Sequence, residues 1–70
     1  MDIFKLRAGE DFIRLGQVLK ASGMVESGAE AKEVIQSGQV LVNDETEIRR
    51  GRKLSKGDIA SYDGKEIRIG

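Results

Sequence analysis

The 70-residue chain contains no cysteine, histidine, proline or tryptophan. Without cysteine it has no disulfide, no thiolate metal site and no cysteine nucleophile. Without histidine it lacks the commonest general base and the commonest metal ligand near neutral pH. So short a chain also has little room to enclose a large substrate pocket. An enzyme is therefore the least favoured class, and no cofactor and no small-molecule substrate are expected.

Long apolar runs are missing as well. No stretch of about 18 apolar residues is present, so no helix is expected to cross a membrane. The first residues do not combine a basic region with a following apolar stretch, so they do not predict a signal peptide. We therefore expect a cytoplasmic protein that makes no contact with membranes.

The net charge is zero, with 12 basic and 12 acidic side chains. Their distribution along the chain is uneven. Residues 49–56 carry five basic side chains and no acidic one, whereas residues 1–48 carry an excess of four acidic side chains. For a polyanionic partner the local field matters more than the total charge. The neutral average thus conceals one concentrated positive segment.

Two short helices are expected in the first half of the chain. Leu15, Val18, Leu19 and Ser22 fall at i, i+3, i+4 and i+7, which predicts a helix over residues 15–22 with an apolar stripe. A second helix is predicted over residues 27–37. The Ser27 hydroxyl can accept from the Glu30 amide there, while the Glu30 carboxylate reaches back to the Ser27 amide. A turn at residues 23–26 would join the two helices into a hairpin. The buried stripe of the second helix is expected to be Ala31, Val34 and Ile35.

The remaining segments alternate in hydrophobicity as strands do. Asp63-Gly64 is a strong hairpin signal, and Asn43-Asp44 predicts a tight turn. The element order predicts an α+β fold, with the helical hairpin packed on one side of a small, mostly antiparallel sheet. The expected strands are Ile3–Arg7, Gln39–Val42, Lys53–Leu54, Ile59–Tyr62 and Glu66–Ile69, with Phe12 and Ile13 extended before the first helix.

The strongest functional candidate is Arg49-Arg50-Gly51-Arg52-Lys53. Four positive side chains in five residues repel one another, so folding alone gives no reason to gather them. A phosphate backbone gives one, because each neutralised phosphate releases condensed counterions. Gly51 lets the backbone turn, so that the arginines beside it can face different phosphates. The alternative is a solvated loop balanced by Asp44, Glu45 and Glu47. Basic segments also bind acidic protein surfaces.

Three further basic residues are candidates for the same surface. Arg14 precedes the first helix, Lys20 shares one face of that helix with Gln17, and Lys32 lies at the edge of the apolar face of the second helix. Each of them is also compatible with an ordinary surface position. The acidic residues near Asp44 lack the length and spacing of a calcium loop, so no metal site is expected.

Aromatic residues are few, and this favours one mode of recognition over another. The chain has only Phe4, Phe12 and Tyr62. Proteins that bind single strands often stack bases on aromatic side chains. The shortage instead favours recognition of shape and phosphates in a folded RNA. We expect Phe4 and Phe12 in the core, and Tyr62 as a half-buried strand residue.

In order and spacing, these pieces resemble the S-four RNA-binding domain, named after small-subunit ribosomal protein four and also known as the alpha-L motif. The matching pieces are Arg14-Leu15 with Leu19, Ser27 with Ala31–Ile35, Gly38–Asn43 as a G-x-V-x-V-N strand and turn, and Gly57-Asp58-Ile59. The stand-alone bacterial branch of the YaaA and YbcJ type is more similar still. The additional matches are Ile13–Lys20, Glu26–Lys32, and Val42–Glu45 followed by Arg49–Leu54.

The resemblance implies one RNA-binding domain over residues 1–70, with its core at about residues 12–62, acting as a monomer without catalysis. The implied partner is structured RNA, either ribosomal RNA or another RNA associated with the ribosome. Gly28 stands where many members have arginine and Gly16 where many have aspartate. The implied contact residues are Arg14, Lys20, Lys32, Arg49, Arg50, Arg52 and Lys53. The main alternative is a protein-interaction module that docks an acidic partner through the same cluster. DNA binding is less favoured because the sequence lacks a recognition helix with several basic or amide side chains.

Overall fold

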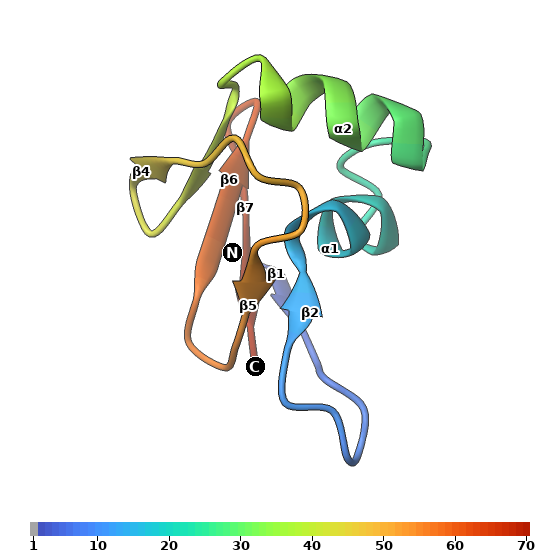
Figure 1. Cartoon of the computed structure of the whole chain (residues 1–70). Helices are drawn as coiled ribbons and strands as arrows, with labels where there is room; N and C mark the ends of the chain where they lie inside the picture. The colour runs from blue at the N-terminus through green and yellow to red at the C-terminus, as the bar shows by residue number, and fades with distance from the viewer. Residues whose placement is uncertain (1) are drawn as a thin grey trace.

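The computed structural model describes residues 2–70 and has an α+β architecture, as predicted (Figure 1). Two helices pack against each other and against the strands. The elements in chain order are β1 (Asp2–Phe4), β2 (Ile13–Arg14), α1 (Leu15–Ala21), α2 (Gly28–Gln36), β3 (Val40–Val42), β4 (Glu45–Thr46), β5 (Lys53–Leu54), β6 (Ile59–Tyr62) and β7 (Lys65–Ile69). Among residues 2–70 no helix is long and apolar enough to cross a membrane.

The strands form two separate sheets. Five of them are ordered β1-β7-β6-β3-β4, and β2 pairs with β5 in a two-stranded ribbon. Within the described residues, every pairing is antiparallel except that of β1 with β7, so the sheet is mostly antiparallel as expected. The first strand is shorter than the predicted Ile3–Arg7 segment. Strand β4 was not predicted, because two polar residues carry no strand pattern.

Two tight turns fix the register of the larger sheet. Asp63 and Gly64 have φ of 52° and 76°, and they join β6 to β7 with Tyr62 opposite Lys65. Asn43 and Asp44 have φ of 52° and 68°, and they join β3 to β4. Positive φ at both central residues is the type I′ arrangement that suits the twist of a hairpin. Both predicted turns are thereby confirmed.

Asn43 also connects two segments that lie 15 residues apart in the sequence. Its Nδ2 donates to Asp58 Oδ1 at 3.0 Å, and its Oδ1 accepts from the Ile59 amide at 2.9 Å. The other Asp58 oxygen accepts from the Ser55 amide at 2.8 Å. The two motif pieces around Asn43 and Asp58 therefore hold β3 against the start of β6, which gives both residues a structural role.

The helix ends follow the predicted chemistry with one difference. The Ser27 hydroxyl accepts from the Glu30 amide at 3.1 Å, as expected for the N-cap of α2. The Glu30 carboxylate, however, accepts from the Glu26 amide at 2.7 Å instead of the Ser27 amide. Gly23 follows α1 with φ of 79°, the left-handed conformation that ends many helices.

One hydrophobic core lies between the helices and the strands. The expected stripes of both helices are buried in it, and Phe4 and Tyr62 pack at its margin. Phe12 is a correction, because 38% of the residue is exposed. Its place lies outside the core, beside basic side chains. The buried apolar residues are Leu15, Val18, Leu19, Val25, Ala31, Val34, Ile35, Val40, Val42, Leu54, Ala60, Ile67 and Ile69.

Candidate nucleic-acid interface

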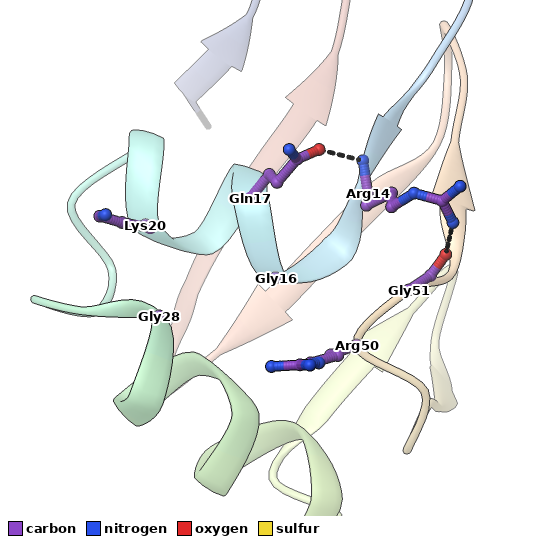
Figure 2. Close-up of a pocket in the computed structure, with 7 residues that line it drawn as sticks. All are labelled: Arg14, Gly16, Gln17, Lys20, Gly28, Arg50 and Gly51. Atoms are coloured by element: carbon purple, nitrogen blue, oxygen red, sulfur yellow. Dashed lines mark hydrogen bonds between the residues drawn. The ribbon is translucent and has the colours of Figure 1, made fainter.

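Residues 47–53, called here the basic loop, are attached to the start of α1. The Leu15 amide donates to the Arg52 carbonyl at 2.8 Å, and the Gly16 amide donates to the Arg50 carbonyl at 2.9 Å. Arg14 Nη1 donates to the Gly51 carbonyl at 2.8 Å (Figure 2). The first turn of a helix has amides without helical partners, and here the loop carbonyls satisfy two of them. The loop and the helical hairpin therefore form one continuous surface.

Glu47, the first residue of the basic loop, is nearly buried and forms ion pairs with two arginines of the loop. Its side chain is only 8% exposed and accepts hydrogen bonds from two arginines. Arg49 Nε and Nη2 donate to the two carboxylate oxygens at 3.0 and 3.1 Å, and Arg52 Nη1 donates at 2.9 Å. The hydrogen bonds from Arg49 and then Arg52 lower the pKa of Glu47 to about 2. Glu47 therefore stays ionised and holds both arginines at the base of the loop.

The ribbon of β2 and β5 places two positive charges opposite each other. Arg14 and Lys53 are Cα partners in the antiparallel register, whereas the neighbouring pair contains the buried Leu54. Like charges directly opposite one another destabilise a sheet. Phe12 lies beside this pair, with Lys53 Nζ 4.8 Å and the Arg14 guanidinium 5.6 Å from its ring centroid. Attraction to the ring offsets part of this repulsion.

Two adjoining hollows bring most of the predicted residues together. One, of about 270 Å³, has Arg14, Lys20 and Arg50 in its wall (Figure 2). The other, of about 430 Å³, is lined by Arg14, Arg49, Gly51, Arg52 and Lys53. Arg14 and Gly51 belong to both hollows. Six of the seven predicted contact residues thus occupy one surface.

Lys32 is the predicted residue that lines neither hollow. It is exposed on α2, four residues after Gly28, which lines the smaller hollow. Residues at i and i+4 lie on the same face of a helix. Lys32 therefore extends the basic surface by one turn along α2.

Much of the positive charge has no nearby counter-charge. Within residues 2–70, Glu47 is the only carboxylate that forms ion pairs, and its partners are Arg49 and Arg52. The expected alternative, a loop whose positive charge is balanced by nearby carboxylates, therefore holds only for Arg49 and Arg52. Within residues 2–70, Asp44 and Glu45 form no ion pair with the loop. Within the same residues, the side chains that keep an unpaired charge on this surface are Arg14, Lys20, Lys32, Arg50 and Lys53.

The sequence did not predict the roles of two contributors, Phe12 and Glu47, and it placed a third, Gln17, only on one helix face with Lys20. Phe12 was expected in the core, and Glu47 was expected only as a diffuse counter-charge. Gln17 lines the smaller hollow, where its Oε1 accepts from the Arg14 amide at 3.3 Å. The spacing of Glu47 from Arg49 and Arg52 is the one local signal that pointed to their ion pairs. Nothing local indicated that Phe12 would lie beside Lys53.

Known proteins are similar in sequence to most of this chain. A sequence model described as the S4 domain matches residues 4–70. RlbA of Bacillus subtilis, named as a probable ribosome maturation protein, is 46% identical over 54 residues, covering 77% of this chain and 76% of RlbA. YbcJ of Escherichia coli is 37% identical over 57 residues, covering 81% of each chain.

The solution structure of YbcJ is similar to the whole arrangement. The TM-score is 0.72 at 35% identity, over 99% of this chain and 86% of YbcJ. That structure was described as revealing an alfaL motif involved in RNA-binding. The predicted family resemblance is thereby confirmed.

Proposed function

The chain belongs to the S4 domain family, and from this membership we propose that it is a non-catalytic domain that binds structured RNA. The domain spans residues 1–70, and the RNA is ribosomal RNA or a precursor of it in the cytoplasm. The RNA-binding motif of YbcJ and the ribosome-maturation name of RlbA support this choice. The proposal assigns the contacts to Arg14, Lys20, Lys32, Arg49, Arg50, Arg52 and Lys53.

The observation that carries the proposal is the gathering of unpaired positive charge. The β2–β5 register sets Arg14 opposite Lys53. The hydrogen bond from the Gly16 amide to the Arg50 carbonyl holds the Arg50 backbone at the start of α1, next to this pair. The pairing of Arg14 with Lys53 does not help the fold, because like charges directly opposite one another in a sheet repel. An RNA backbone compensates for the repulsion when its phosphates displace counterions on this surface.

The proposed mechanism is electrostatic docking without covalent chemistry. The β2–β5 ribbon and the start of α1 form the platform, and Glu47 forms ion pairs with Arg49 and Arg52. Long basic side chains on such a platform contact phosphates and 2′-hydroxyls across a folded RNA more readily than they read bases within a duplex. Shape and phosphate spacing therefore govern how this surface docks on a folded RNA.

The test compares two double variants that remove the same charge from different places. Arg50→Ala with Lys53→Ala removes two unpaired cations of the basic surface. Lys65→Ala with Arg68→Ala removes two exposed cations of β7, and Lys65 lines hollows that contain none of the basic-loop residues. Binding to a ribosomal RNA hairpin is followed by fluorescence anisotropy at fixed salt.

The first double variant should weaken binding by tenfold or more, and the second by less than threefold. Equal losses would mean that net charge alone attracts RNA, which contradicts a defined site. If the unmodified protein bound no RNA and instead captured an acidic protein through the same residues, the RNA-binding proposal would be refuted. The protein-interaction alternative would then take its place.

A further inference from the structure

The smaller hollow lies where three segments of the chain meet. Gly16 and Gln17 come from the first turn of α1, Gly28 from the first residue of α2, and Arg50 and Gly51 from the basic loop (Figure 2). At about 270 Å³ it is slightly smaller than the usual range for drug-sized ligands, about 300–1,000 Å³. Its size suits one small flat group better than a whole cofactor.

Glycines keep this hollow open. Three of its seven lining residues are Gly16, Gly28 and Gly51, so backbone forms much of the wall. A Cβ built on Gly28 would meet nothing within 4 Å, and one built on Gly16 would meet only the Arg50 backbone and Cβ at 3.5 and 3.6 Å. A larger side chain at Gly28 would occupy free space.

The polar groups around the hollow are hydrogen-bond donors and cations. Among residues 2–70 no side chain or carbonyl accepts from the Arg50 guanidinium. Gln17 uses its Oε1 on the Arg14 amide, and its Nε2 has no acceptor in the described chain. Lys20 and Arg14 complete the rim. A ligand that suits this hollow carries carbonyl oxygens on a flat ring and a negative charge close by.

We propose that this hollow receives a single unpaired nucleotide of the bound RNA. The inference rests on the proposed function and adds a specificity site to it. The base lies against the glycine wall, and its carbonyl oxygens accept from Gln17 Nε2 and the Arg50 guanidinium. Its phosphate faces Arg14 and Lys20. The protein therefore prefers RNA with a bulged or looped-out base over a perfectly paired stem.

Three RNAs distinguish recognition of the bulged base from recognition of the backbone distortion that a bulge creates. They share one stem, which is perfectly paired in the first, carries one bulged uridine in the second, and carries one bulged abasic residue in the third. Uridine is the probe because its ring bears two carbonyl oxygens. The unmodified protein should bind the uridine bulge roughly tenfold more tightly than either other RNA, as expected for one or two added hydrogen bonds.

Gly28→Leu tests the hollow itself, with Gly28→Ala as the matched control. Gly28 lies in a helix without a positive φ, and both replacements are better helix formers than glycine. Thermal melts should therefore show equal or higher stability for both variants. Gly28→Leu should abolish the preference for the uridine bulge and keep both the affinity for the paired stem and its salt dependence. Gly28→Ala should behave as the unmodified protein.

Two results would overturn the inference while leaving RNA binding intact. Equal affinity for the uridine and abasic bulges would mean that the protein senses a flexible joint and not a base. A preference that survives in Gly28→Leu, and also in a Gly28→Met variant, would place the base elsewhere. Failure of all three RNAs to bind the unmodified protein would instead refute the proposed function.

Discussion

Replacing Glu47 by glutamine should destabilise the protein without changing its shape. The variant keeps the size of the side chain but removes the negative charge that accepts from Arg49 and Arg52. A hydrogen bond to a charged group contributes about 1.5–3 kcal/mol. The Arg49 side chain is 73% exposed, so water can replace the hydrogen bonds that it loses, whereas the Arg52 side chain is 32% exposed. The exposed Arg49–Glu47 pair therefore contributes little. We expect a loss of about 2 kcal/mol in the free energy of unfolding, mainly from the Arg52–Glu47 pair.

The loss should depend on pH in a defined direction. The pKa of Glu47 is lowered from 4.5 to about 2 in the folded protein. Its contribution is therefore fully present above about pH 4.5 and disappears as the pH falls toward 2. The difference in unfolding free energy between the native protein and Glu47→Gln should be largest at pH 7 and small near pH 2.5.

Urea denaturation followed by circular dichroism at pH 7, 5 and 3 measures this difference. At pH 7 the loss corresponds to a fall of about 10 °C in Tm for a chain of this size. Glu45→Gln is the matched control, because Glu45 is exposed and forms no ion pair within residues 2–70. It should change stability by less than about 0.5 kcal/mol. A gap for Glu47→Gln that stays constant from pH 7 to pH 3 would contradict the assigned role of the carboxylate.

Two further substitutions separate stability from binding. Phe12→Leu should leave the unfolding free energy within about 1 kcal/mol, because the ring is partly exposed, but should weaken RNA binding severalfold as Arg14 and Lys53 lose their platform; unchanged affinity in anisotropy titrations would exclude that role. Asn43→Ala should do the reverse. It removes the hydrogen bonds to Asp58 and to the β6 amide at a residue with positive φ, so urea melts should show a loss of about 2 kcal/mol. RNA affinity of the folded variant should change by less than twofold, and a larger change would make Asn43 part of the interface.

Local chemistry explains why much of the fold was predictable. The N-cap at Ser27 and the glycine after α1 mark helix ends through interactions within a few residues. The turn at Asp63-Gly64 follows from the positive φ that both residues tolerate. Each of these signals is complete within a short window of sequence, so it survives without knowledge of the rest of the fold.

The parts that sequence did not predict depend on contacts between distant segments. The pairing of β2 with β5 brings Phe12 beside Lys53, 41 positions later in the chain, and an aromatic residue near a predicted helix is otherwise expected in the core. Strand β4 exists because it pairs with β3, since its own two residues have no strand pattern. The burial of Glu47 likewise requires the loop to fold over it.

The sequence predicted only part of the basic surface. The cluster from Arg49 to Lys53 is a local feature, and its charge is evident from composition. The sequence did not indicate which charges stay unpaired, because that depends on Glu47 taking up Arg49 and Arg52. Nor did it indicate the hollow beside Arg50, which forms only when the starts of α1 and α2 and the basic loop meet.

The central claim is that this surface docks on RNA through its unpaired positive charges. The most direct test is a salt titration of binding to a ribosomal RNA hairpin, with a DNA duplex of matched sequence beside it. Four phosphate contacts by the unpaired cations Arg14, Lys20, Lys32 and Lys53 predict a slope of about −3 in a plot of log K against log salt. We expect this slope together with tighter binding to RNA than to DNA. A flat slope, or equal affinity for both nucleic acids, would contradict RNA docking by this surface.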